Sequence, residues 1–210
     1  MRYLASFEKE IILSTAMATL EEVGFAVEEI QKTSKAALTL LHCTTSYPCP
    51  FDEVNLLALK TLEQKFSVPV GYSDHTMGAE VALAARALGA CVLEKHFTLD
   101  RNMPGPDHLC SLEPAELKKL VRSVRNVEIA FGSSEKKPTA AEEALKSNVR
   151  RSLVLARDLQ EGAILGEDDF IDKRAGDGIP PYEISKLVGK KLCTQKRVDE
   201  LIEWKDVCGE

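Results

Sequence analysis

The sequence predicts an α/β protein that consists of half of a parallel βα barrel followed by a small β-rich domain. Four short apolar runs recur at intervals of about 25 to 30 residues, which is the spacing of repeated βα units. A helical pattern follows each run, and strands that alternate with helices form parallel sheets with right-handed crossovers. After residue 132 the chain becomes polar and charged, and short strands with turn signals follow.

Each expected element has a local signal. The helix after the first strand should begin at Thr19, with Glu22 three residues on as its capping partner. The last helix should have Pro114 in its first turn and Gly132 as its stop. The expected strands are IILS (11–14), ALTLLH (37–42), VPVGYS (68–73) and ACVLEKH (90–96), and the expected helices cover 18–32, 51–66, 78–89 and 114–132.

The composition change divides the chain into three parts. Residues 1–132 are expected to form the half barrel, and residues 133–149 a polar linker with one exposed helix. Residues 150–210 are expected to form the β-rich domain, with turns at Glu161-Gly162 and Gly176-Asp177-Gly178. A domain of this size is marginally stable by itself unless it docks on something.

Charge and hydropathy exclude several classes of protein. The chain has 210 residues, of which 44% are hydrophobic and 29% charged, and its formal net charge is −6. Such a balance argues against general nucleic-acid binding, which needs a basic face. Apolar runs stay well short of the roughly 20 residues of a membrane span. The first residues also lack a signal-peptide pattern, so we expect a cytoplasmic protein.

Six cysteines are present: Cys43, Cys49, Cys91, Cys110, Cys193 and Cys208. They form no CxxC pair, and two of them lie inside apolar runs. We therefore expect reduced thiols without a metal or redox role.

Polar side chains gather where the expected strands end. Ser73, Asp74 and His75 close the third strand, and His96 closes the fourth. In parallel βα arrays, functional groups collect at these carboxyl ends. Two neutral imidazoles from adjacent strands can share a divalent ion, with water and substrate oxygens in the remaining positions. The alternative is that each histidine, like His42 at the end of the second strand, only bonds to a neighbour.

Several motifs in order resemble the sialic acid synthase family. They are ILSTAMATLEEV, LLHCTTSYPCPFDEVN, GYSDHT, EKHFTLDR and PGPDH. The tail LARDLQEGAILGEDDFIDKRAGDGI resembles the SAF, or antifreeze-like, domain that closes the family's chain. The resemblance implies the C-terminal half of a (βα)8 TIM barrel joined to a SAF domain. It also implies an enzyme that condenses phosphoenolpyruvate with an N-acetylated hexosamine, releasing phosphate and a nine-carbon 2-keto sugar acid.

Site roles follow from this resemblance motif by motif. His75 and His96 match metal ligands, usually for Mn²⁺ or Mg²⁺. The phosphoenolpyruvate-binding residues are expected to be Ser14, Thr45 and Ser73, and the sugar-binding residues Tyr47, Asp107 and Arg174. The family also implies a domain-swapped homodimer, in which Arg174 of the SAF domain reaches the partner's barrel. The PGPDH form is closer to sialic and legionaminic acid synthases than to pseudaminic acid synthases.

The sequence departs from the family pattern in places. Ala16 and Ala175 stand where relatives usually have glycine and proline, and Thr45 where they often have asparagine. The chain also begins at what resembles the fifth strand, so the main catalytic groups are expected in a missing N-terminal half. Two alternatives stay open: a truncated, non-catalytic chain that keeps metal or sugar binding and a dimerising SAF module, and an unrelated metal-dependent aldolase half barrel, which leaves the tail unexplained.

Overall fold

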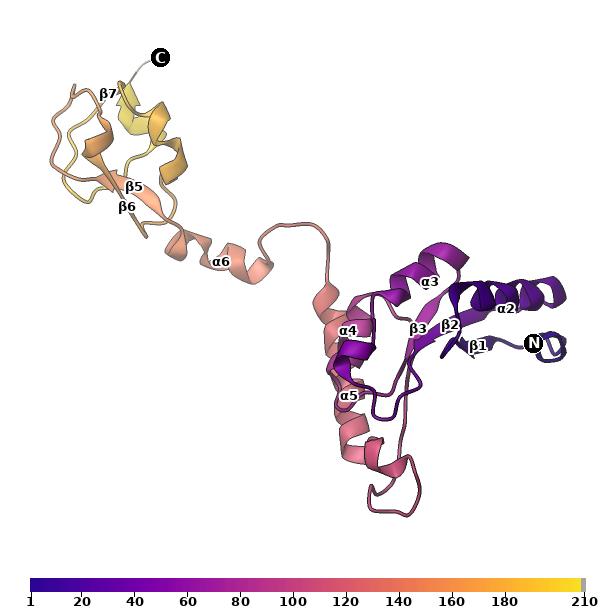
Figure 1. The fold of residues 1–210 in the computed structure, drawn as a ribbon. Coiled ribbons are helices and arrows are strands. Elements are labelled where there is room, and N and C mark those ends of the chain that lie inside the picture. Colours follow the sequence, from indigo (N-terminus) through magenta and orange to yellow (C-terminus); the bar gives the residue numbers. More distant parts are fainter. Residues whose placement is uncertain (209–210) are drawn as a thin grey trace. The chain divides into compact units, whose positions relative to one another are not determined.

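The computed structural model describes residues 1–208, which fall into two compact units (Figure 1). Unit 1 is residues 1–134, and unit 2 begins at Glu135. Each unit has its own hydrophobic core. Within the described residues, no helix combines the length and the apolar character that crossing a membrane requires.

Unit 1 contains a parallel four-stranded sheet, which confirms the α/β prediction. Its strands lie in the order β1 (Ile11–Ser14), β2 (Leu38–Cys43), β3 (Val70–Asp74) and β4 (Leu93–Lys95). The register pairs Cys43 with Ser73 and Asp74 with Lys95. Because the strands are parallel and in sequence order, their carboxyl ends lie along one edge of the sheet.

The helices of unit 1 carry the predicted terminal signals. Thr19 and Glu22 form a reciprocal capping box at the start of α2 (Leu20–Thr33). Helix α5 (Pro114–Phe131) has its proline at the first turn and ends at Gly132, whose φ of 49° favours glycine. The other helices are α1 (Arg2–Ala5), α3 (Ala58–Phe66), α4 (Glu80–Ala87) and the short 3₁₀ turns η1 (Phe51–Glu53) and η2 (His108–Cys110).

The helix expected over 51–66 is wrong in its first half. Residues 51–53 form the 3₁₀ turn η1, and the α-helix starts only at Ala58. Asn55 between them has a φ of 49°. This left-handed conformation cannot continue a right-handed helix, and asparagine tolerates it better than most residues.

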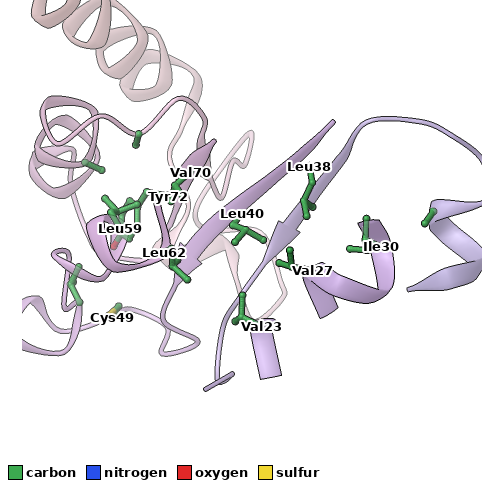
Figure 2. Close-up of a cluster of buried hydrophobic side chains, with 14 residues drawn as sticks. Val23, Val27, Ile30, Leu38, Leu40, Cys49, Leu59, Leu62, Val70 and Tyr72 are labelled. Carbon is green, nitrogen blue, oxygen red and sulfur yellow. The ribbon is translucent and has the colours of Figure 1, made fainter. Parts of the chain in front are cut away.

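The core of unit 1 lies between the sheet and its helices (Figure 2). Val27 of α2, Leu40 of β2, Leu62 of α3 and Tyr72 of β3 are all buried there. Strand β1 alternates instead, since Ile12 is 51% exposed while its neighbours Ile11 and Leu13 pack against the core. Strand β1 therefore presents one open face.

Unit 2 is built from short elements. Helix α6 (Ala140–Val149) precedes two antiparallel ribbons, β5 (Ser152–Leu155) with β6 (Phe170–Lys173) and β7 (Lys191–Leu192) with β8 (Val207–Cys208). Three 3₁₀ turns, η3 (Glu167–Asp169), η4 (Pro181–Lys186) and η5 (Trp204–Asp206), connect them. The buried side chains are Leu153, Leu155, Leu159, Leu165, Phe170, Ile179, Leu187, Leu192 and Ile202.

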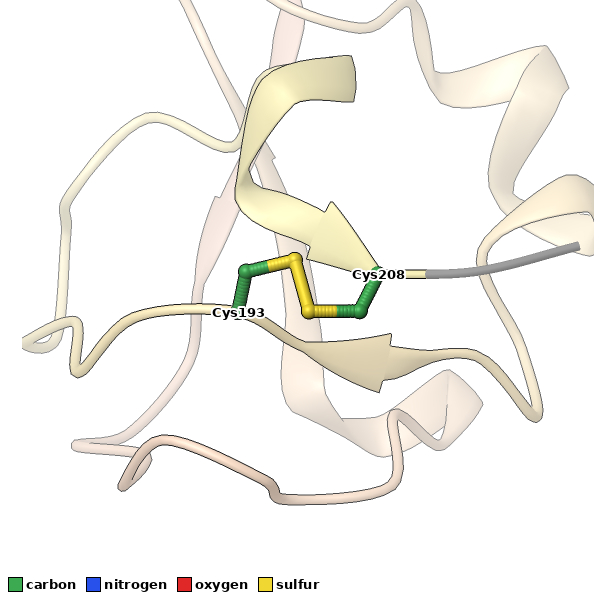
Figure 3. Close-up of a disulfide and its surroundings, with 2 residues drawn as sticks. All are labelled: Cys193 and Cys208. Atoms are coloured by element: carbon green, nitrogen blue, oxygen red, sulfur yellow. A yellow bond between two sulfur atoms is a disulfide. The ribbon is translucent and has the colours of Figure 1, made fainter.

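A disulfide joins Cys193 to Cys208 (Figure 3), so the expectation of reduced thiols is wrong for this pair. The pairing of β7 with β8 brings the two Cα atoms to 5.1 Å, within the usual range for a bridge. The sequence spacing alone carried no sign of this ribbon. Cys43, Cys49, Cys91 and Cys110 are free thiols.

Asp169 is a buried carboxylate that organises the turn before β6. It accepts hydrogen bonds from the backbone N–H of Gly166 at 2.8 Å and from Nε of Arg157 at 2.6 Å. Burial opposes its ionisation, but these two donors outweigh that effect and hold the pKa of Asp169 below its usual value. The charged form of Asp169 therefore stabilises unit 2.

Replacing Asp169 with asparagine should lower the free energy of unfolding of unit 2 by about 1–2 kcal/mol near neutral pH. The single tryptophan, Trp204, lies in unit 2 and reports its unfolding by fluorescence. Because the folded pKa is lowered, the wild-type advantage is complete above an ordinary Asp pKa of about 4 and is lost as the pH falls further. The exposed Asp168→Asn is the matched control. A constant difference between Asp169→Asn and wild type down to pH 2 would contradict this account.

Candidate functional site

Two of the chain's histidines and one tyrosine form a cluster at the carboxyl edge of the sheet. His75 follows β3, His96 follows β4, and Tyr47 lies in the loop after β2. The Tyr47 hydroxyl is 2.5 Å from Nε2 of His75 and also hydrogen-bonds to Nε2 of His96. The Tyr47 ring lies 4.0 Å from the His75 ring and 4.6 Å from the His96 ring, centroid to centroid. Both Nε2 atoms thus point toward one position.

The backbone of the loop after β2 sets the tautomer of His75. Its Nδ1 lies 2.7 Å from the carbonyl oxygen of Thr44, which can only accept a hydrogen bond. In the neutral ring, Nδ1 therefore carries the proton and Nε2 carries the free lone pair. This is the arrangement in which a histidine can bind a metal ion through Nε2.

The Tyr47 hydroxyl has one proton to share between two imidazoles. Because Nε2 of His75 is an acceptor, Tyr47 donates to His75 and accepts from Nε2–H of His96. A cation that used both Nε2 lone pairs would have to displace the hydroxyl. It would also need His96 to carry its proton on Nδ1 instead.

Burial favours the uncharged forms of His75 and Tyr47. It lowers the pKa of His75 below the usual histidine value, which favours the neutral imidazole that a metal needs. Burial also raises the pKa of Tyr47 to about 12, and the carboxylates of Asp107 and Glu94 act in the same direction. Tyr47 is therefore a neutral phenol at physiological pH.

Ser73 links the cluster to a carboxylate. Its hydroxyl donates to Oε1 of Glu94 at 2.6 Å and lies 3.5 Å from Nε2 of His75. Ser73 is buried, whereas Glu94 is exposed. An incoming anion would therefore compete with Glu94 for the Ser73 proton. The sequence motifs indicate Ser73, but they do not reveal this bond or the Thr44 carbonyl behind His75.

The remaining predicted site residues lie at the surface. Ser14 ends β1 and is exposed, as is Thr45 in the loop after β2. Asp107 is exposed just before η2. Arg174 is exposed after β6 in unit 2. The structure thus brings His75, His96, Tyr47 and Ser73 together.

The other two histidines, His42 and His108, only bond to neighbouring groups, which was the alternative to a metal-binding role. Nε2 of His42 lies 2.7 Å from the carbonyl oxygen of Val54, and Nδ1 of His108 lies 2.8 Å from the hydroxyl of Thr98. Both rings hold neighbouring loops in place. They provide an internal contrast to the His75 and His96 pair.

The donor set suits a divalent ion in part. Two imidazoles whose Nε2 atoms converge are typical ligands for first-row transition metals. Among residues 1–208, no group of three or more His, Cys, Asp or Glu side chains has the arrangement of a metal site. Residues His75 and His96 would therefore hold the ion with at least two positions left for oxygen ligands from water or substrate.

The fold and this site define an α/β protein whose polar cluster lies at the carboxyl edge of a parallel sheet. The sequence profile of the NeuB family matches residues 1–136, and that of the SAF domain matches residues 150–207. The NeuB match covers more than half of the chain. The chain belongs to the NeuB family and carries a SAF domain.

Two of the relatives are named as synthases of N,N'-diacetyllegionaminic acid. The chain is 44% identical to the N,N'-diacetyllegionaminic acid synthase of Legionella pneumophila, over 99% of this chain and 59% of the relative. It is 46% identical to that of Campylobacter jejuni, over 96% and 61%. The crystal structure of N-acetylneuraminic acid synthetase from Leptospira borgpetersenii matches 68% of this chain and 50% of that one, with 39% identity and a TM-score of 0.62. The chain therefore spans about three fifths of the curated relatives' length.

Replacing Tyr47 with phenylalanine should strengthen Mn²⁺ binding about 2- to 10-fold. The variant keeps the ring but removes the hydroxyl that a cation must displace, and one such hydrogen bond is worth about 0.5–1.5 kcal/mol. Isothermal titration calorimetry of the full chain measures the affinity. Tyr182→Phe, at an exposed position in unit 2, is the matched control. Weaker Mn²⁺ binding in Tyr47→Phe would show that the hydroxyl assists the cation instead of competing with it.

Proposed function

We propose that this chain is part of a sialic-acid-type synthase. The reaction joins phosphoenolpyruvate to an N-acetylated hexosamine resembling N-acetylmannosamine, and it releases phosphate and a nine-carbon 2-keto sugar acid. The observation that carries the proposal is the convergence of His75 and His96 beside Ser73, at the edge where parallel βα proteins bind substrates. Two relatives named as N,N'-diacetyllegionaminic acid synthases support the choice of product class.

Three hydroxyl side chains are proposed to bind phosphoenolpyruvate. Ser73 would donate a hydrogen bond to the substrate carboxylate in place of its hydrogen bond to Glu94. The exposed hydroxyls of Ser14 and Thr45 would donate to other oxygens of the same substrate. Hydrogen bonds to a charged acceptor are stronger than neutral ones, which favours this exchange. The Thr45 hydroxyl has a shorter reach than the asparagine that relatives often have at this position.

Three further residues are proposed to bind the sugar. Tyr47 offers a ring face and a neutral hydroxyl. Asp107 would accept hydrogen bonds from sugar hydroxyls, and its charge already influences Tyr47. Arg174 would hold the N-acetyl carbonyl of a sugar bound in a partner subunit, as in a homodimer that exchanges its SAF domains. This last role is proposed from the DKRAGDGI motif alone.

We further propose that His75 and His96 hold a divalent ion, Mn²⁺ or Mg²⁺. When bound, such an ion supplies Lewis acidity toward the aldehyde oxygen of the sugar. The chain's own contribution is to keep His75 neutral and to aim both rings at one position. The Thr44 carbonyl fixes the tautomer of His75, and the buried surroundings of His75 favour its neutral form.

The four βα units are proposed to form half of a (βα)8 barrel. Strands β1 and β4 are the two outer strands of the sheet, and β1 presents an open face. The curated relatives are longer than this chain by enough sequence for further βα units. The proposed activity therefore belongs to the completed barrel, in which the remaining units supply cations for the substrate phosphate.

The metal proposal predicts that the double variant His75→Ala/His96→Ala loses measurable Mn²⁺ binding and keeps its helical circular dichroism signal. Removing both lone pairs leaves the site without a protein nitrogen ligand. The control removes the two structural rings, His42→Ala/His108→Ala, and should bind Mn²⁺ like the wild type. Unchanged Mn²⁺ affinity in the His75/His96 variant would contradict the assignment.

The activity proposal is tested by supplying N-terminal βα units. Co-expressed with the N-terminal βα units of the Legionella relative, this chain should release phosphate from phosphoenolpyruvate only when N-acetylmannosamine and Mn²⁺ are both present. The 210 residues alone should show no turnover. The N-terminal units are proposed to supply cations for the substrate phosphate. Without two such charge-assisted contacts, the free energy of substrate binding is weaker by about 3–6 kcal/mol, which is a factor of about 10² to 10⁴ in affinity.

Two outcomes of that experiment would count against the proposal. Metal-dependent synthesis by the chain alone would contradict the need for a completed barrel. An inactive but folded complex would contradict the assigned reaction. It would favour the non-catalytic alternative, which predicts metal and sugar binding without phosphate release.

A further inference from the structure

The most enclosed ion pair of unit 1 lies directly behind the histidine cluster. Nζ of Lys95 is 2.8 Å from Oδ2 of Asp74, and the two side chains are only 5% and 0% exposed. A comparably enclosed pair, Lys196 with Asp206, lies in unit 2, with side chains that are 15% and 6% exposed. Neither the proposed reaction nor the assigned ligands use Asp74 or Lys95.

The pair also fixes the backbone on both sides of His75. Oδ1 of Asp74 accepts hydrogen bonds from the N–H of Thr76 at 2.9 Å and from its hydroxyl at 2.8 Å. Nζ of Lys95 donates a second hydrogen bond to the carbonyl oxygen of Thr76 at 2.5 Å. The residues on either side of His75, Asp74 and Thr76, therefore both accept hydrogen bonds from the ammonium group of Lys95.

The register extends this restraint to His96. Asp74 and Lys95 are paired residues of β3 and β4, so the two histidines are the next residues on adjacent strands. Side chains alternate between the faces of a strand. Ser73 and Glu94 meet on one face, and Asp74 and Lys95 therefore meet on the other. The ion pair cannot touch a substrate bound beside Ser73, and any effect on the site must pass through the histidines.

A contribution to folding stability does not explain why the charged pair Asp74 and Lys95 is buried here. A buried ion pair loses hydration that its attraction barely offsets, and apolar residues of similar volume are often equally good. We propose that Asp74 and Lys95 are positioning residues that hold the exits of β3 and β4 so that both Nε2 atoms meet at one point. This inference adds two residues to the proposed metal site. Only the Mn²⁺-binding test below depends on that proposed site.

The first test is the double variant Asp74→Asn/Lys95→Met, which removes both charges and keeps the approximate side-chain volumes. It should unfold within a few degrees of the wild type and bind Mn²⁺ about 10- to 100-fold more weakly, the usual effect of losing groups that orient metal ligands. The matched control is Asp206→Asn/Lys196→Met, which makes the same chemical change in unit 2. That control should leave Mn²⁺ affinity unchanged.

The second test needs no metal. Long-range ¹H–¹⁵N spectra of the histidine side chains report which ring nitrogen carries the proton. In the wild type, His75 should be a single Nδ1–H tautomer, because Nδ1 donates to Thr44. In the double variant it should become a mixture. The milder Thr76→Val, which removes only the hydroxyl donor to Asp74, should weaken Mn²⁺ binding a few-fold and serves if the double variant does not fold.

The outcomes separate the two proposals. A folded variant with wild-type Mn²⁺ affinity and a wild-type His75 spectrum would overturn the positioning role. Wild-type protein that binds no Mn²⁺ would overturn the proposed metal site, and the His75 tautomer would still decide whether Asp74 and Lys95 position the ring. Loss of the tautomer in the variant together with weaker Mn²⁺ binding would support both.

Discussion

The parallel, in-register pairing of β3 with β4 is the constraint on which the site depends. With Asp74 opposite Lys95, the next residue on each strand is a histidine, and both histidines leave the sheet at the same level. A shift of one residue would send one imidazole to the opposite face. The buried core supports this register, because Tyr72 of β3 is buried in it and its paired residue Leu93 of β4 packs against it.

The site itself is a set of polar groups that already have partners. The Tyr47 hydroxyl hydrogen-bonds to two imidazoles, and the Ser73 hydroxyl donates a hydrogen bond to Glu94. Ligand binding therefore exchanges hydrogen bonds, so the gain on binding is the difference between two sets of contacts. Charged ligands have the advantage in such an exchange, because hydrogen bonds to charged groups are stronger. This favours a divalent cation and an anionic substrate over neutral ones.

Patterns with a local physical cause could be predicted from the sequence. The Thr19–Glu22 capping box and the limits of α5 at Pro114 and Gly132 depend only on neighbouring residues. The four parallel strands followed from apolar runs and their spacing. The convergence of His75 and His96 followed from the rule that parallel strands end at one edge. The chemistry of each residue in GYSDHT and EKHF came from family resemblance.

Features set by tertiary contacts were not predictable. The left-handed Asn55 broke the helix expected over 51–66, and such a conformation has no strong signature in a single residue. The Cys193–Cys208 bridge depended on a ribbon of two-residue strands that the sequence did not reveal. The tautomer of His75 depends on a carbonyl oxygen, and every residue has one. Its identification as Thr44 required the fold.

The central claim is that the imidazoles of His75 and His96 share one divalent ion. The most direct measurement is electron spin-echo envelope modulation of the Mn²⁺-loaded chain with unlabelled and ¹⁵N-labelled histidine. The account predicts nitrogen couplings from two imidazoles that change with the label, and from only one after His96→Ala. Modulation from water protons alone, with no histidine nitrogen, would contradict it.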